Sequence, residues 1–136
     1  MAAKVLDSWA LLAFYKDEPC ASEVEKLIQH AADKGKPLFL SVVNWTEIYY
    51  SLERAGGKAV AERVAEQIAE LPIQIVGVGD DLKTARTAAA FKAAHKMSLA
   101  DAFAAALSKE KKAELVTGDP ELKALEGQIK IHWLAR

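Results

Sequence analysis

The chain has 136 residues, of which 51% are hydrophobic and 27% charged, and it carries a net charge of −1 with an isoelectric point near 6.3. This length is sufficient for a domain with its own core, and the composition excludes a disordered chain. The charge argues against a protein that coats nucleic acid nonspecifically, but not against a nuclease, because metal-binding carboxylates also lower the net charge. We expect one domain over residues 1–136.

Neither secretion nor membrane insertion is expected. Cys20 is the single cysteine, so no disulfide can form within the chain. The N-terminus runs directly into an apolar strand and leaves no room for a signal peptide. The longest stretch without charge, 37–46, has ten residues, far short of the roughly 20 that cross a bilayer. We expect a cytoplasmic protein.

Apolar runs and helical periodicities alternate along the chain. Strands are expected at residues 3–6, 38–40, 73–78, 114–116 and 129–131, the last with room to extend to 133. Helices are expected at residues 8–15, 21–33, 42 to beyond 52, 59–71, 81–96, 99–109 and 119–125. Helix 99–109 is apolar on nearly every side, which indicates an interior position. The alternation predicts an α/β fold with a parallel sheet and helices on both faces.

Four acidic residues lie where a strand passes into a helix or within the apolar helix beside it: Asp7, Glu47, Asp101 and Asp119. In an open parallel sheet, the strand ends at which helices begin are where ligands bind. Carboxylates held close together raise one another's pKa and destabilise the fold unless a cation lies among them. We therefore expect these four acids to converge on a divalent metal.

Each acid also has a purely structural explanation. Asp7 can cap the helix that follows it, and Asp119 precedes a proline and a further acid, as at a helix N-terminus. Asp101 follows Ser98 by three residues, as in a capping box. Glu47 has the weakest structural role, because helix-dipole stabilisation fades beyond the first turn. For Asp101 the metal-ligand interpretation is favoured over a capping role, because burying a carboxylate in an apolar helix without a partner is destabilising.

The donor types indicate which metal such a site would take. Oxygen ligands alone suit Mg²⁺ or Mn²⁺. A zinc site is not expected, because one cysteine and three scattered histidines lack the necessary spacing. The histidines are His30, His95 and His132.

Basic residues are concentrated in one predicted helix. Between residues 83 and 96 there is no acid, and the basic side chains are Lys83, Arg86, Lys92, His95 and Lys96. A second cluster consists of Lys109, Lys111 and Lys112. Such runs are most often solvated helix faces. The functional alternative is a surface that faces the phosphates of RNA.

The order of these motifs resembles that of the PIN-domain nucleases and, within them, of the VapC-type toxins of prokaryotic toxin–antitoxin pairs. The matching motifs are Asp7-Ser8, Glu47, Ser98-Leu99-Ala100-Asp101 and Thr117-Gly118-Asp119. The resemblance covers essentially the whole chain. Trp9 departs from it, because a small residue is common there, and Leu122 stands where an aromatic residue often follows the last acid.

The resemblance implies an α/β/α sandwich with a five-stranded parallel sheet and a Mg²⁺- or Mn²⁺-dependent endoribonuclease. The acids it implies to be catalytic are Asp7, Glu47, Asp101 and Asp119, of which the first, third and fourth would hold the metal. Glu47 would be a further ligand, directly or through water. Ser8 and Thr117 would be supporting polar residues near the metal. Beside the RNA substrate, the implied partners are a second copy of the chain and a small VapB-like antitoxin, whose C-terminal segment lies across the active site.

Alternative functions come from other classes of protein. A response-regulator receiver also gathers acids around Mg²⁺, but it starts with paired acids, whereas Asp7 stands alone. A haloacid-dehalogenase-like phosphatase needs a second acid two residues after the first, where this chain has Trp9. A PIN domain without catalysis, and a PIN nuclease that cleaves DNA or processes RNA, remain open.

Overall fold

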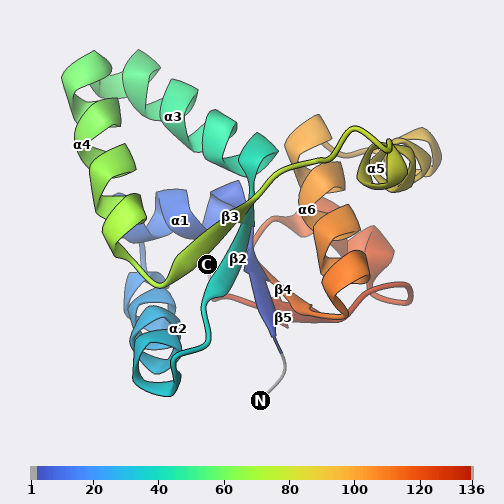
Figure 1. The fold of residues 1–136 in the computed structure, drawn as a ribbon, viewed down its shortest axis with the longest axis horizontal. Coiled ribbons are helices and arrows are strands. Elements are labelled where there is room, and N and C mark those ends of the chain that lie inside the picture. Colours follow the sequence, from blue (N-terminus) through green and yellow to red (C-terminus); the bar gives the residue numbers. More distant parts are fainter. Residues whose placement is uncertain (1–2, 136) are drawn as a thin grey trace.

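The computed structural model describes residues 3–135 as a five-stranded sheet with helices on both faces (Figure 1). The strands are β1 (Lys4–Leu6), β2 (Leu38–Ser41), β3 (Ile73–Val76), β4 (Glu114–Thr117) and β5 (Ile131–Trp133). Their order in the sheet is β3-β2-β1-β4-β5, and every pairing is parallel. The predicted α/β class and the five-stranded parallel sheet are therefore confirmed.

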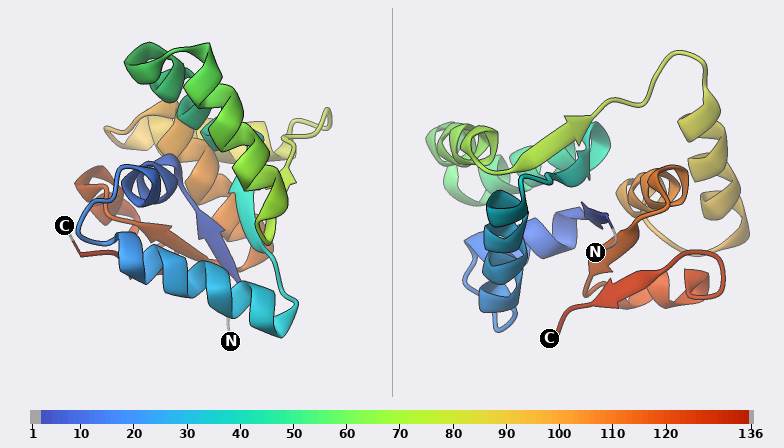
Figure 2. Two further views of the ribbon diagram at one scale, coloured as in Figure 1. Left: turned by 90° about the vertical axis from the view of Figure 1, so that its left-hand side faces the viewer. Right: turned by 60° about the horizontal axis from the view of Figure 1, so that its bottom comes forward.

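Helices form a layer on each side of the sheet. They are α1 (Ser8–Tyr15), α2 (Ala21–Lys34), α3 (Val42–Gly56), α4 (Lys58–Glu70), α5 (Lys83–Ala94), α6 (Leu99–Lys111) and the 3₁₀ helix η1 (Pro120–Leu125). Helices α1 to α4 lie on one side, and α5, α6 and η1 lie on the other (Figures 1 and 2). Among the described residues, no helix is long and apolar enough to span a membrane.

Side chains that alternate along the central strands divide the core in two. Leu6 and Val116 pack with the layer of α1 to α4. Val5 and Leu115 pack with α5, α6 and η1. Because strand residues point alternately to opposite faces, two adjacent apolar residues in each strand indicate burial on both sides. Helix α6 buries most of its length, including a run of alanines, and its predicted interior position is confirmed.

The segment between β3 and α5 differs from the prediction. The strand ends at Val76 rather than at residue 78, and the helix begins at Lys83 rather than at residue 81. Gly79 and Leu82 both have the left-handed conformation, with φ of 71° and 64°. Neither a strand nor a helix can continue through such residues. The loop between β3 and α5 therefore covers residues 77–82, whereas the sequence predicted only residues 79 and 80 outside the strand and the helix.

The C-terminal region differs in two further respects. The predicted helix at 119–125 is a 3₁₀ helix that starts at Pro120. The last strand starts at Ile131 rather than at residue 129. Ile129 is buried against the α6 side of the core although it lies outside the strand. Its apolar character therefore comes from the packing of a turn.

Candidate metal centre

The strand order reverses between β1 and β4. From β1 the chain proceeds outward through β2 to β3, and β4 and β5 then lie on the other side of β1. Such a reversal opens a crevice at the carboxyl ends of the strands. Asp7 directly follows β1, and Asp119 follows β4 after one intervening residue. Leu6 pairs with Val116, so the two acid-bearing loops leave the sheet side by side.

Asp7 is fully buried, and hydrogen bonds hold both of its carboxylate oxygens. Oδ1 accepts from the backbone N–H of Ala10 at 2.8 Å, and Oδ2 accepts from the Thr117 hydroxyl. The predicted helix-capping role of Asp7 is thus confirmed. Burial is the main cause that raises the pKa of Asp7 to about 7, and the charges of Asp119 and Glu47 raise it further, against the lowering by its two hydrogen bonds.

Thr117 links the two loops through its hydroxyl group. The hydroxyl donates to Asp7 and accepts from the backbone N–H of Asp119 at 3.0 Å. Thr117 is completely buried at the end of β4. One side chain therefore sets the position of Asp7 and the course of the chain into Asp119.

Asp101 lies in the first turn of α6 and is 5% exposed. The Oγ of Ser98 accepts from the Asp101 N–H at 3.1 Å, as the capping pattern predicted. The Oδ2 of Asp101 is buried and has no hydrogen-bond partner among the residues described. Burial above all, then the neighbouring Asp119 carboxyl and the charges of Asp7 and Glu47, raise the pKa of Asp101 to about 8. Such a group is stabilised either by a proton or by a cation.

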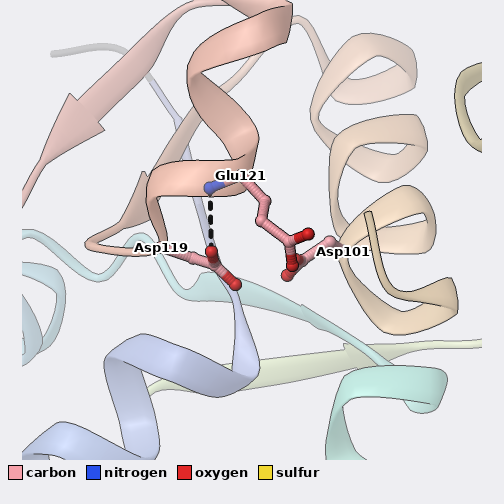
Figure 3. A group of neighbouring side chains, drawn as sticks. All are labelled: Asp101, Asp119 and Glu121. Carbon is pink, nitrogen blue, oxygen red and sulfur yellow. Dashed lines mark hydrogen bonds between the residues drawn. The ribbon is translucent and has the colours of Figure 1, made fainter. Parts of the chain in front are cut away.

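Three carboxylates come within ligand distance of one another. Asp101, Asp119 and Glu121 each offer one oxygen, and these oxygens all lie within 4.8 Å of each other (Figure 3). The Oδ1 of Asp119 accepts from the N–H of Glu121 at 3.0 Å, which caps the first turn of η1. An all-oxygen donor set of this kind fits Mg²⁺ or Mn²⁺.

Glu121 was missed in the sequence analysis, which treated it only as an acid in the first turn of a helix. Figure 3 shows that its side chain reaches from η1 towards Asp101 on α6. The available signal was its position two residues after a candidate ligand, at a helix start just beyond a strand.

Asp7 and Glu47 lie near this group of three, but they are not members of it among the described residues. Glu47 is half-buried on α3, and the Tyr50 hydroxyl approaches its Oε2 at 3.5 Å. Its charge nevertheless raises the pKa of both Asp7 and Asp101. The four predicted acids thus share one electrostatic environment, and two of them meet within ligand distance.

Ser8 points towards α3. Its Oγ donates to the main-chain carbonyl of Asn44 at 3.3 Å and accepts from the Asn44 Nδ2 at 2.9 Å. Asn44 is a second residue of this region that the sequence analysis missed. It lies in an otherwise ordinary helical stretch, and only the folded chain shows what it contacts.

The basic residues predicted to bind RNA lie on or just after α5, on the outer side of α6 (Figure 1). Lys83, Arg86 and Lys96 are exposed. Lys92 donates from Nζ to the Met97 carbonyl at 2.9 Å, close to the start of α6. All four cations are exposed, and Lys92 additionally helps to hold the loop before Ser98.

The fold and the acids together define an α/β protein with a candidate divalent-metal site at the switch point of its sheet. The strand order also excludes the receiver alternative, because receivers have the order 2-1-3-4-5. The family model of the PIN domain matches residues 4–128. The chain belongs to the PIN domain family, and the resemblance found in the sequence is confirmed.

Solved structures with the same fold include several toxin–antitoxin proteins. VapBC from Salmonella typhimurium, in a DNA-bound crystal structure, has a TM-score of 0.72 at 14% identity, with 97% of this chain and 98% of that chain covered. VapBC2 from Rickettsia felis, bound to a promoter DNA fragment, has a TM-score of 0.72 at 12% identity, with 98% and 99% covered. VapC20 from Mycobacterium tuberculosis, a sarcin-ricin loop cleaving toxin, has a TM-score of 0.69 at 17% identity, with 93% and 96% covered. Comparison with curated protein sequences found no significant match.

Proposed function

We propose that this protein is a divalent-metal-dependent endoribonuclease of the VapC type, the toxin of a VapBC-like toxin–antitoxin module. The observation that carries the proposal is the group formed by Asp101, Asp119 and Glu121, whose carboxylate oxygens lie within 4.8 Å of one another. The match to the PIN domain and the full-length likeness to VapBC structures support it.

The residues of the crevice fit a divalent cation. Asp101 has a buried oxygen without a partner among the described residues, and only oxygen donors surround it in the group. Asp101, Asp119 and Glu121 would hold the cation together with Asp7, and Glu47 would take part directly or through water. When bound, a cation of this kind lowers the pKa of a coordinated water and neutralises charge on a scissile phosphate.

The chain's own contribution is to hold its acids in place before the substrate arrives. Asp7 is fixed by the Ala10 N–H and the Thr117 hydroxyl, and the backbone of Asp101 is fixed by the Ser98 cap. Acids that are already oriented need little reorganisation during the reaction, which lowers the barrier.

RNA as the substrate and an antitoxin as the partner are part of the same proposal. The similar VapC20 is a sarcin-ricin loop cleaving toxin, and similar proteins were solved as VapBC assemblies. Lys83, Arg86 and Lys96 are exposed and would guide the RNA backbone, which makes binding weaker at high salt. Lys92 would contribute less, because its ammonium group already bonds to Met97. We also propose a homodimer.

Cleavage of total cellular RNA by the purified protein tests this function. The parent protein, Asp101→Asn and the exposed control Asp33→Asn are incubated with Mn²⁺ or with a chelator, and all new RNA ends are sequenced. We expect discrete ends that require both Mn²⁺ and Asp101, with Asp33→Asn cutting as the parent does. If the parent leaves this RNA intact but cuts a DNA substrate offered in the same buffer, the alternative of a DNA-directed PIN nuclease replaces the proposal.

A further inference from the structure

Asn44, on α3, is completely buried and bonds to residues that adjoin two of the predicted acids. Its Nδ2 donates to the Ser8 Oγ at 2.9 Å and to the Ala100 carbonyl oxygen at 3.2 Å. Ser8 follows Asp7 directly, and Ala100 directly precedes Asp101. We propose that Asn44 is a positioning residue that sets the separation of α1, α3 and α6 at the metal centre.

The orientation of the Asn44 amide is determined by its partners. The Ala100 carbonyl can only accept a hydrogen bond, so the amide nitrogen must face it. The Ser8 hydroxyl accepts from the same nitrogen and donates to the Asn44 main-chain carbonyl at 3.3 Å. Both donor hydrogens of the amide are therefore used, one towards α1 and one towards α6.

The third helix in this arrangement is α3 itself. Glu47 lies three residues after Asn44, which is nearly one helical turn, so the two side chains project from the same side of α3. One buried side chain thus relates the helix that carries Glu47 to the residues beside Asp7 and Asp101. The loop of Asp119 is tied separately, through Thr117.

Stability alone does not account for this asparagine. Its Oδ1 is buried and accepts no hydrogen bond within the described part of the chain, and an unpaired buried oxygen is destabilising. Leucine has the same branched shape without polar atoms. In an Asn44→Leu variant, the Ser8 hydroxyl can still donate to the main-chain carbonyl at position 44. The Ala100 carbonyl still accepts the backbone hydrogen bond from within helix α6. The specific loss is the link between helices.

The hydrogen bonds from Asn44 to Ser8 and Ala100 control the affinity of the site for its metal. The inference therefore rests on the proposed metal site. Metal ligands bind well only when neighbouring groups hold them within about half an ångström of the required position. Removal of the groups that orient ligands typically lowers metal affinity by about 10- to 100-fold. We expect a loss of about tenfold or more in Mn²⁺ affinity for Asn44→Leu.

Calorimetric Mn²⁺ titration of the folded protein of residues 1–136 provides the test. The variants are Asn44→Leu, Ser8→Ala, their double variant, Asp101→Asn, which removes a proposed ligand, and the control Ser108→Ala. Ser108 is a buried hydroxyl near the C-terminal end of α6 that donates to the Ala113 carbonyl. We expect weaker Mn²⁺ binding in Asn44→Leu and Ser8→Ala and parent-like binding in Ser108→Ala. The double variant should lose no more than about as much as Asn44→Leu, because both substitutions break one link.

The possible outcomes separate this inference from the proposed function. A parent that binds Mn²⁺, with Asp101→Asn that does not, supports the metal site. A folded Asn44→Leu with parent-like Mn²⁺ affinity then overturns the role of Asn44 and leaves the site standing. If Asn44→Leu does not fold, Ser8→Ala decides in its place, and parent-like affinity there overturns the role. A parent that binds no Mn²⁺ overturns both proposals.

Discussion

The indole ring of Trp9 lies directly against the backbone of Gly118. A Cβ atom at position 118 would be 2.3 Å from the Cη2 atom of Trp9, and the ring cannot move aside as a flexible chain end could. Trp9 follows Asp7 by two residues, and Gly118 immediately precedes Asp119. The large residue on one acid-bearing loop is thus accommodated by the absence of a side chain on the other.

We expect Gly118→Ala to destabilise the protein by about 1–3 kcal/mol, because it forces an extra methyl group into a filled space. The same overlap should displace Asp119 and weaken Mn²⁺ binding. Urea unfolding measures the first effect and calorimetry the second. Gly127→Ala is the matched control, since a Cβ there would meet nothing within 4 Å. A second substitution, Trp9→Leu, should restore much of the loss. Equal stability of Gly118→Ala and Gly127→Ala would contradict the steric argument.

Much of the site could be predicted because local sequence determines where each acid enters the fold. Asp7 directly follows one apolar strand and Asp119 lies two residues beyond another, and parallel strands present their carboxyl ends at one edge of the sheet. Asp101 stood out as a lone charge in an apolar helix. These three predictions needed no knowledge of which strands are neighbours.

The remaining features depend on contacts between distant parts of the chain. The pairing of β1 with β4 joins residues about 110 apart, and no local pattern specifies it. Glu121 and Asn44 are ordinary polar residues of helices until α6 packs beside them. The turn at Ile129 resembled a strand because burial, rather than strand pairing, requires an apolar residue there.

Without metal, the protein should become less stable as the pH rises. The pKa of Asp7 is raised from 3.8 to about 7 and that of Asp101 to about 8. A carboxyl whose pKa is raised by folding binds its proton more tightly in the folded state. Its stabilising contribution is complete below the unfolded value and is lost as the pH rises through the folded value. We expect the free energy of unfolding to fall by several kcal/mol between about pH 4 and pH 8, measured by urea unfolding in a chelator.

The Asp101→Asn variant checks the origin of that pH dependence. Asparagine cannot ionise, so the variant should lose less stability over the same range and should exceed the metal-free parent above about pH 8. An Asp33→Asn control, on the exposed face of α2, should follow the parent. A parent whose stability rises through this range would contradict the assignment of buried, mutually repelling carboxyl groups.

Without metal, Asp101→Asn should be more stable than the parent above about pH 8. Mn²⁺ should make the parent the more stable of the two. A cation that binds only the folded state stabilises it by about 2.7 kcal/mol at a concentration 100 times the dissociation constant. The parent should therefore melt at a higher temperature in Mn²⁺ than in a chelator, whereas Asp101→Asn should not respond. Identical melting of the parent in the two conditions would argue against a preformed site.

Glu121→Gln tests whether the acid missed in the sequence analysis is a ligand. Glutamine keeps the shape of the side chain but removes the charge that would face the cation beside Asp101 and Asp119. We expect about a tenfold or greater loss of Mn²⁺ affinity with almost unchanged stability, because Glu121 is exposed. Glu66→Gln, on the exposed side of α4, is the control. Parent-like Mn²⁺ binding by Glu121→Gln would leave Asp7, Asp101 and Asp119 as the ligands and return Glu121 to its role at the start of η1.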